Sequence, residues 1–331
     1  MDEFDKIPLV LLFEYLCLDD LLMFNLVDQY MHKQVSLKAK PWIEASNQNP
    51  LVYIKSFRNC KIHMALSYKV NIDWLTEFGK NIVSLSFYRC LDNISVDSVL
   101  TKVNYLKLEH TNIIADSGLQ NLVNLRNLSL RQGVSVTDAG IKALTNLRWL
   151  DLSKNEHITD EGLQHLTKLT TLILIANNNI TNDGIKNLVG LKELSLKKTG
   201  RINIGGVKKL SNLMCLDISY RGGMDGMDQL TNLRRLTIDF NSDVANGELK
   251  LLTNLEILSM IGCGYILDTT IGCLTNLEAL DISCSTISVS SIIQLTKLQY
   301  LCSLRSNLTR YQTGELALRG VKFSWPYAAF Y

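Results

Sequence analysis

The feature that most constrains the fold of this chain is a phrase of leucines that returns at nearly constant spacing. The first position of the pattern Leu-x-x-Leu-x-Leu occurs ten times, at intervals of 22 residues except for one of 20 and one of 21. A fixed period in this range indicates a repeat architecture, in which each repeat buries its apolar residues only against its neighbours. The ten first positions are Val103, Leu125, Leu147, Leu169, Leu191, Leu213, Leu233, Leu255, Leu277 and Leu298, and a weaker copy begins at Ile82.

The repeat that begins at Leu147 illustrates the local structure that each repeat predicts. Leu150 and Leu152 alternate with a polar residue, which is the period of a strand with one buried face. Asn155 follows where a buried amide can bond backbone groups of its own loop and of the neighbouring one. A threonine–aspartate pair at Thr159 then predicts a helix N-cap, and apolar residues follow at helical spacing.

A glycine returns inside the predicted helix of five successive repeats. Glycine in a helix interior costs about 1 kcal/mol relative to alanine. We therefore expect either a close approach between neighbouring helices or a bend in the short helix. The glycines are Gly118, Gly140, Gly162, Gly184 and Gly206.

The phrases LTNLRWLDLSKNEHITDEGLQHL and LVNLRNLSLRQGVSVTDAGIKAL resemble leucine-rich repeats, over residues 82–310. Their Thr-Asp-x-Gly helix start is similar to that of the repeats found in F-box-associated arrays. The resemblance implies an α/β leucine-rich-repeat solenoid, with parallel strands on the concave face and short helices on the convex face. It does not identify a partner, because fold does not imply function.

The segment Ile7–Gln34 does not follow the repeat, and it resembles an F-box. The resemblance implies a small all-helical module that binds the Skp1-type adaptor of cullin–RING ubiquitin ligases. Its first half is about three residues shorter than the family pattern, and Tyr30 or Met31 replaces the expected tryptophan. The alternative is that these helices only cap the first repeat. The matching residues are Ile7, Pro8, Tyr15, Leu16, Asp20, Leu21, Leu22 and Val27.

These patterns predict four segments along the chain. Residues 1–48 form the F-box-like helical module, and residues 49–81 form a connector and an incomplete first repeat. Within the connector, Cys60–Leu66 is a candidate degenerate strand. Residues 82–310 form the leucine-rich repeats. Residues 311–331 are expected to cap the last repeat, with a docking tail as the alternative for the aromatic-rich stretch Val321–Tyr331.

The side chains between the strand leucines are expected to point out from the concave face and to bind a protein partner. An exposed tryptophan beside a tyrosine and an arginine has the composition of an interface hot spot. The alternative is that Trp149 lies flat over the stems of its neighbours. The predicted partner-binding residues are Tyr105, Lys107, Arg131, Trp149, Asp151, Ile173, Ile175, Glu193, Lys197, Arg235 and Asp239.

One repeat, Leu213–Asn232, is two residues shorter than its neighbours and contains the glycine-rich stretch Arg221–Gly226. The loss predicts a shorter convex segment and a local change in curvature. A phosphate-binding loop is the weaker interpretation, because the stretch has neither a GxGxxG pattern nor a P-loop lysine.

Composition and charge exclude several other classes of protein. A net charge of +2 provides no large basic field for nucleic acid. The acidic N-terminus and the interrupted apolar run Ile7–Leu18 predict neither a signal peptide nor a membrane span, hence a cytoplasmic protein. The eight cysteines are scattered without metal-ligand spacing, and the five histidines are not paired with a nucleophile at any motif.

The sequence therefore predicts a binding protein with no enzymatic activity, no cofactor and no metal. It favours the substrate-recognition subunit of an SCF-type ubiquitin ligase, in which the repeats bind the target. The alternative is a stand-alone leucine-rich-repeat binding protein, or an effector that binds a host protein, whose N-terminal helices only cap the solenoid.

Overall fold

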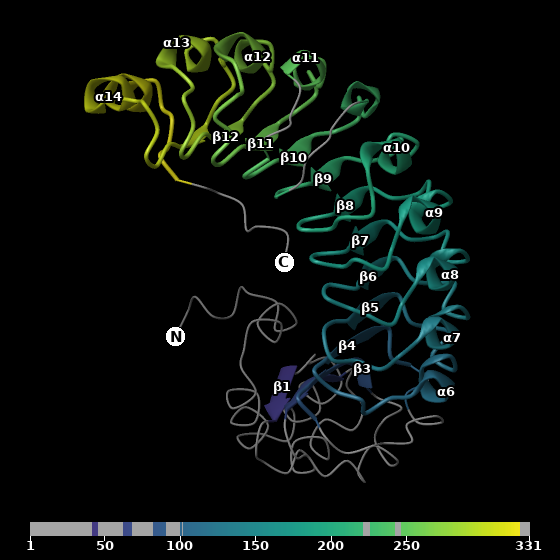
Figure 1. The fold of residues 1–331 in the computed structure, drawn as a ribbon. Helices are drawn as coiled ribbons and strands as arrows, with labels where there is room; N and C mark the ends of the chain where they lie inside the picture. Colours follow the sequence, from purple (N-terminus) through teal and green to yellow (C-terminus); the bar gives the residue numbers. More distant parts are fainter. Residues whose placement is uncertain are drawn as a thin grey trace, which may run out of the picture. The chain divides into compact units, whose positions relative to one another are not determined.

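The computed structural model describes residues 42–45, 62–67, 82–90, 100, 102–220, 226–241 and 246–324. The chain divides into two compact parts, which we call the N-terminal part (Met1–Leu150) and the C-terminal part (Asp151–Tyr331). In each part, short parallel strands alternate with loops and with helices that are mostly a single turn long (Figure 1). The boundary between the parts falls inside strand β6 (Trp149–Asp151).

In the N-terminal part, consecutive strands pair in parallel and in chain order from β1 to β5. The inward leucines of these strands, such as Leu85, Leu106 and Leu128, are completely buried. The strands are β1 (Trp42–Ala45), β2 (Ile62–Ser67), β3 (Ile82–Tyr88), β4 (Tyr105–Glu109) and β5 (Asn127–Leu130). The helices are α6 (Asp116–Leu119) and α7 (Asp138–Ile141).

Strand β1 corrects one expectation and strand β2 confirms another. The predicted all-helical module at 1–48 is wrong for Trp42–Ala45, because these residues pair in parallel with β2. Four residues without the leucine phrase are too few to reveal a strand by periodicity. Strand β2 confirms the degenerate strand expected at Cys60–Leu66. The predicted adaptor-binding residues, from Ile7 to Val27, lie outside the described residues.

In the C-terminal part, strands β7 to β13 also pair in parallel and in chain order. The strands are β7 (Thr171–Ile173), β8 (Glu193–Ser195), β9 (Cys215–Asp217), β10 (Arg235–Thr237), β11 (Ile257–Ser259), β12 (Ala279–Asp281) and β13 (Tyr300–Cys302). The helices are α8 (Asp160–Leu163), α9 (Asn182–Ile185), α10 (Ile204–Val207), α11 (Asn246–Leu249), α12 (Asp268–Gly272), α13 (Val289–Ile292) and α14 (Arg310–Leu318). The predicted leucine-rich-repeat architecture of parallel strands and short helices is confirmed.

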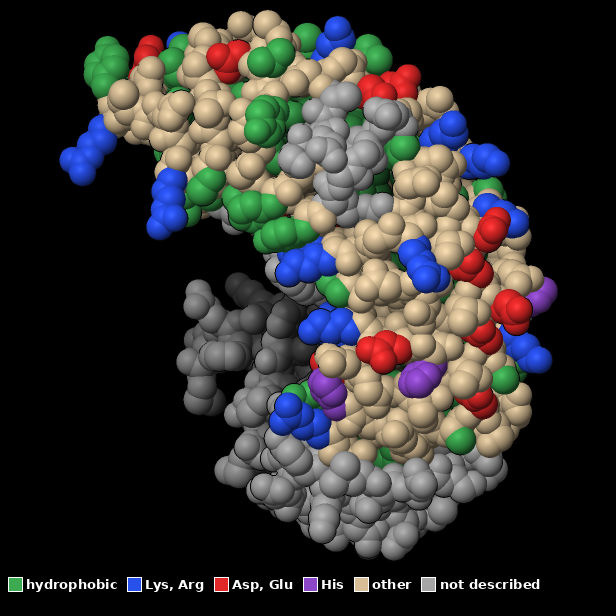
Figure 2. All heavy atoms as spheres, viewed as in Figure 1, with side chains coloured by type: hydrophobic (Ala, Val, Ile, Leu, Met, Phe, Trp, Pro, Cys, Tyr) green, Lys and Arg blue, Asp and Glu red, His purple; other side chains and the backbone are tan. Residues whose placement is uncertain are grey.

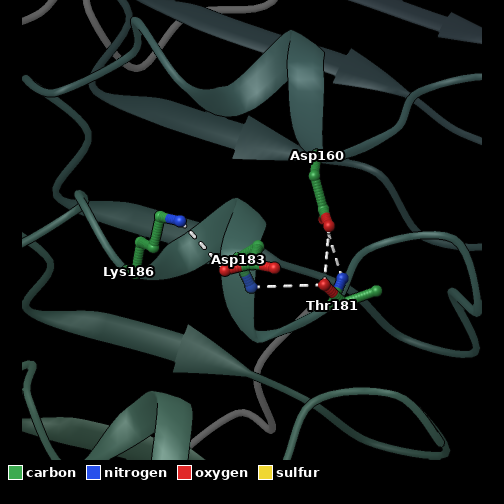
Figure 3. A network of polar contacts seen from close by, with 4 residues as sticks. All are labelled: Asp160, Thr181, Asp183 and Lys186. Atoms are coloured by element: carbon green, nitrogen blue, oxygen red, sulfur yellow. Dashed lines mark hydrogen bonds and ion pairs between the residues drawn. The ribbon is translucent and has the colours of Figure 1, made fainter.

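The helices of neighbouring repeats are joined by side-chain hydrogen bonds at their N-termini. Thr159 caps α8, as the sequence predicts, and Thr181 caps α9 in the same way: its hydroxyl accepts from the backbone N–H of Asp183 at 3.2 Å. Its own N–H and hydroxyl donate to the carboxylate of Asp160, one repeat earlier, at 2.8 and 2.6 Å (Figure 3). Asp116 and Thr137 form the same pair of bonds in the N-terminal part. We call this arrangement the aspartate ladder.

The aspartate ladder explains the recurring helix glycine. A Cβ atom at Gly184 would lie less than 3.0 Å from Oδ1 of Asp160, and one at Gly140 less than 3.0 Å from Oδ1 of Asp116. Gly206 is equally close to Asn182. The expected close approach is thus confirmed at these three positions. The group that approaches the glycine is the carboxylate or amide of the preceding repeat.

The loop asparagines satisfy buried backbone groups, as the sequence predicts. Asn177 donates to the carbonyl oxygens of Leu152 and Asn155 in the preceding repeat, at 3.0 and 3.2 Å. Its side-chain oxygen accepts from the backbone N–H groups of Asn179 and Ile180. One buried amide therefore joins two loops.

The short repeat replaces its helix with a single 3₁₀ turn, η3 (Met227–Gln229). Gly226 precedes this turn with φ of 97°, a left-handed conformation that glycine adopts without strain. The N–H groups of Gly226 and Met227 donate to the carboxylate of Glu248 in the next repeat. The expected shortening is confirmed on the helix side, while residues 221–225 lie outside the described residues.

The last described element, α14, begins at Arg310 and is nine residues long. Thr309 and Gln312 form a capping box at its start. Leu316 and, beyond the helix, Val321 are buried, and Lys322 forms a parallel bridge with Tyr300 of β13. Residues 325–331 of the predicted cap lie outside the described residues.

Candidate functional site

The strand face of the N-terminal part presents an aromatic pair. Tyr105 and Trp149 are both partly exposed, and their rings stack with centroids 6.4 Å apart and planes 25° apart. Strand β5 lies between their strands, and its Asn127 is in register with Tyr105. Strands two positions apart are separated by about 9.6 Å. The two rings therefore lean toward each other above β5.

Charged side chains flank this pair. Lys107 forms an ion pair with Glu109 at 3.0 Å, and both side chains keep part of their surface exposed. Lys107 and Arg131, like Tyr105 and Trp149, were expected on this face, and all four are partly exposed. The structure thus places the four predicted residues of the N-terminal part on strands β4 and β6 and directly after β5.

A second aromatic contact in the N-terminal part was not predicted. The ring of Tyr88, which is 38% exposed, meets His110 edge to face at 6.2 Å. The guanidinium of Arg89 lies over the Tyr88 ring at 5.1 Å. Tyr88 is the last residue of β3, while Arg89 and His110 directly follow β3 and β4, so these residues extend the surface past the strand ends.

Two predicted partner-binding residues of the C-terminal part are buried, and the expectation that they are exposed is wrong. Asp151 is 3% exposed and Ile173 is 4% exposed. The carboxylate of Asp151 accepts from the N–H and hydroxyl of Ser153 at 2.9 and 2.5 Å. Parallel strands lie about 4.8 Å apart, so the side chains of adjacent strands cover one another. A side chain that points out from the strand face is therefore not always exposed to solvent.

The other predicted residues of the C-terminal part, Ile175, Glu193, Lys197, Arg235 and Asp239, are partly exposed. Asp239 is tied into the fold, because its carboxylate accepts from the Ser259 hydroxyl at 2.6 Å and the Ile261 N–H at 2.9 Å. Burial raises the pKa of Asp239 above its usual value, and this effect exceeds the lowering by those two hydrogen bonds.

One column of residues was missed by sequence reasoning. Asn155 and Asn177 occupy one loop position of the repeat. The residue just before that position adopts a left-handed backbone in most repeats, with φ between 52° and 61° at the non-glycine members. Its N–H donates to a carbonyl of the next repeat, as Tyr220 does to Asp239 at 2.8 Å. The side chains of this left-handed column are thereby held at the ends of the strands. Its non-glycine members are Arg89, His110, Lys154, Ala176, Lys198, Tyr220, Phe240, Cys284 and Arg305.

The left-handed column could have been found from the sequence. Its members stand immediately before the loop position that Asn155 and Asn177 occupy, as Lys154 does before Asn155 and Ala176 before Asn177. Periodicity shows where they lie but gives no reason to expect their side chains to gather. The backbone conformation supplies that reason.

The described residues show no metal-binding cluster of histidine, cysteine, aspartate or glutamate side chains. Within the same residues, no helix is long and apolar enough to cross a membrane. The described cysteines are free thiols, and burial raises the pKa of the Cys215, Cys263 and Cys302 thiols.

Repeat by repeat, the described parts of the chain have the leucine-rich-repeat fold. Solved structures with this fold are similar to it, although no family model and no curated protein match the sequence. An internalin from Listeria monocytogenes is 23% identical with a TM-score of 0.55, and the match covers 74% of this chain and 81% of that one.

Two further structures match over a larger share of this chain. A chain in the crystal structure of the mouse RP105/MD-1 complex is 20% identical to this one with a TM-score of 0.59, and the match covers 84% of this chain and 53% of that one. A TLR13–ssRNA13 complex is 20% identical with a TM-score of 0.55, covering 83% and 47%. At these identities the similarity establishes the fold alone. The chain spans about half the length of these two structures.

Proposed function

We propose that this chain is a protein-binding scaffold whose principal contact is the Tyr105–Trp149 pair. The observation that carries the proposal is that two large aromatic rings stack on the strand face while each keeps exposed surface. Aromatic side chains supply large contact areas and dominate interface energetics, and tryptophan and tyrosine are enriched among hot spots.

The surroundings of the pair have the composition of an interface rim. Lys107, Glu109 and Arg131 are partly exposed and provide charges that can orient a protein partner. The proposal extends to the partly exposed predicted residues of the C-terminal part, which are Ile175, Glu193, Lys197, Arg235 and Asp239. The buried residues Asp151 and Ile173 are not included.

The test has two steps. First, proteins that co-purify with the intact chain are identified, and the candidate partner is produced on its own. Second, its dissociation constant is measured against the wild-type chain and the Tyr105→Ala variant. Removal of a hot-spot side chain costs more than about 1 kcal/mol, so we expect binding to weaken about tenfold.

Tyr265→Ala is the matched control, because Tyr265 is 75% exposed and lies outside the strand face. We expect this control to bind as the wild type does. If Tyr105→Ala and Tyr265→Ala bind equally well, the aromatic pair is not the contact and this proposal is wrong.

We further propose that the F-box-like residues between Ile7 and Val27 bind the adaptor of a cullin–RING ligase, so that the chain recruits targets for ubiquitination in the cytoplasm. Support comes from the F-box-like residues, of which Leu21 and Leu22 match best in spacing. The alternative is a stand-alone or host-interacting binding protein.

A pull-down with purified adaptor compares the full chain with a chain that lacks residues 1–40. This truncation retains β1, which begins at Trp42 and pairs with β2. The ligase proposal predicts that only the full chain retains the adaptor. Failure of the full chain to retain it favours the alternative and leaves the scaffold proposal intact.

A further inference from the structure

Four successive repeats of the C-terminal part build a continuous stack at the left-handed column. The ammonium of Lys198 lies 4.8 Å from the centroid of the Tyr220 ring. The Tyr220 and Phe240 rings stack with centroids 4.9 Å apart and planes 25° apart. A Cβ at Gly262 would lie 2.8 Å from Cδ1 of Phe240, so the glycine leaves room for this ring. We call these four residues the aromatic–lysine stack.

The aromatic–lysine stack keeps much of its surface exposed. Tyr220 is 45% exposed and Phe240 is 50% exposed. The left-handed backbone costs about 1–2 kcal/mol for residues with a Cβ, but it occurs throughout the column and belongs to the fold. In the described C-terminal part these are the two aromatic members of the column, whose other members are Lys154, Ala176, Lys198, Gly262, Cys284 and Arg305. The repeat fold accounts for the left-handed backbone at this site. It gives no structural reason for two exposed aromatic rings there.

The neighbours of the two rings lie against their faces, so the ring edges contribute to the exposed surface of the stack. Tyr220 is placed between Lys198 and Phe240 in the column, and Phe240 between Tyr220 and Gly262. The edge of an aromatic ring carries the positive end of its quadrupole, which attracts carboxylates and carbonyl oxygens. Sequence-tolerant binding of single-stranded nucleic acid depends instead on ring faces on which bases stack. The stack therefore favours acidic protein groups over bases.

The charges around the stack also favour acidic protein groups. Lys197 adds a second ammonium 5.8 Å from the Tyr220 centroid. Over the described C-terminal residues, the left-handed column contains three cations, Lys154, Lys198 and Arg305, and no carboxylate. The adjacent Asp239 carboxylate is engaged with Ser259 and Ile261. Figure 2 shows hydrophobic side chains grouped beside lysine and arginine side chains on one face of the repeats.

We propose that the aromatic–lysine stack is a docking surface for an acidic segment of a protein partner. Carboxylates of the segment contact Lys197, Lys198 and the ring edges, while an apolar side chain of the segment packs against the exposed rims of Tyr220 and Phe240. The inference rests on the proposed scaffold function and adds the chemistry of a second contact, separate from the Tyr105–Trp149 pair.

The experiment uses the full chain and an array of short synthetic peptides. One set is acidic and contains aromatic or leucine residues, a second replaces every carboxylate by its amide, and a third is acidic without apolar residues. A fluorescent oligouridine tests nucleic acid. We expect preferential binding of the first set and weaker binding as salt increases, because exposed charge pairs are screened.

Two variants and two matched controls locate the binding surface. Lys198→Glu and Phe240→Ala are each expected to weaken binding of the first peptide set about tenfold. Lys208→Glu changes an exposed lysine at the end of α10, and Tyr265→Ala removes an exposed ring elsewhere. Both controls, and Trp149→Ala, are expected to bind as the wild type does.

Several results would overturn the inference. If the acidic and amide peptide sets bind equally well, or if no set binds, the stack does not select acidic segments and the inference is wrong. Oligouridine binding that is lost in Lys198→Glu and Phe240→Ala would assign the stack to nucleic acid. Loss of peptide binding in Trp149→Ala, but not in Lys198→Glu, would place the peptide at the Tyr105–Trp149 pair. In that case the scaffold proposal stands and this inference is wrong.

Discussion

Replacing Gly184 by alanine tests whether the helix glycine is required by the aspartate ladder. In an ordinary helix interior the change stabilises the fold by about 1 kcal/mol. Here the new Cβ would lie less than 3.0 Å from Oδ1 of Asp160, 3.1 Å from its Cγ and 3.1 Å from Cγ2 of Ile180. The Asp160 carboxylate must therefore move, and it loses its hydrogen bonds to the N–H and hydroxyl of Thr181.

The expected magnitude follows from those two bonds. Hydrogen bonds to a charged group contribute about 1.5 kcal/mol each at the lower end of their range, which suits this partly exposed site. Losing both costs about 3 kcal/mol, and the helix-propensity gain offsets about 1 kcal/mol. We therefore expect Gly184→Ala to lower the free energy of unfolding by about 2 kcal/mol.

The assay is urea unfolding followed by circular dichroism, with the slope of the transition compared between variants. Gly314→Ala in α14 is the matched control, because a Cβ there meets nothing within 4 Å. It should stabilise the chain by up to about 1 kcal/mol. In an Asp160→Ala background, Gly184→Ala should no longer destabilise. If Gly184→Ala stabilises as much as Gly314→Ala, or costs the same in both backgrounds, the ladder does not explain the glycine.

Three further predictions concern a loop amide and two carboxylates. Asn177→Ala removes the donor to two buried carbonyls, and with about 1–3 kcal/mol for each unsatisfied group it should lower the thermal midpoint markedly in calorimetry. Burial would raise the pKa of Asp268, but hydrogen bonds from Ser288 and Ser291 outweigh it and hold that pKa below its usual value. Its stabilising effect is therefore present above the usual aspartate pKa and is lost as pH falls through the lowered value. Burial raises the pKa of Asp239, so its contribution has the opposite sign: it is present below the usual aspartate pKa and is lost as pH rises through the raised value. At neutral pH, Asp268→Asn should lower the midpoint and Asp239→Asn should raise it, and equal shifts in one direction would contradict this assignment.

The repeat phrase was sufficient to predict the strands, the buried leucines and the threonine caps. Leu172 and Leu194 are completely buried, and Thr159 caps α8 as expected. These features depend on periods within one repeat, which a sequence displays directly. The glycine also indicated a close approach, but its partner at Gly184 is Asp160 of the preceding repeat, and only the three-dimensional stacking identifies it.

The candidate site was less predictable, because exposure on a sheet depends on neighbouring strands. Trp149 and Tyr105 were expected on one face and do stack together. Asp151 and Ile173 belong to the same predicted face and are buried. The pairing of Tyr220 with Phe240 depends on a left-handed backbone, for which neither residue has a preference, so the side-chain types carried no indication of it.

The central claim is tested most directly by comparing two adjacent residues that point to opposite faces of β6. Binding of the identified partner and the free energy of unfolding are measured for Trp149→Ala and Leu150→Ala. Because Trp149 is partly exposed and Leu150 is completely buried, we predict that Trp149→Ala weakens binding more than about tenfold and changes stability little. Leu150→Ala should instead cost about 2–5 kcal/mol of stability. Equal losses of stability in both variants, with partner affinity unchanged in Trp149→Ala, would show that Trp149 is structural and contradict the account.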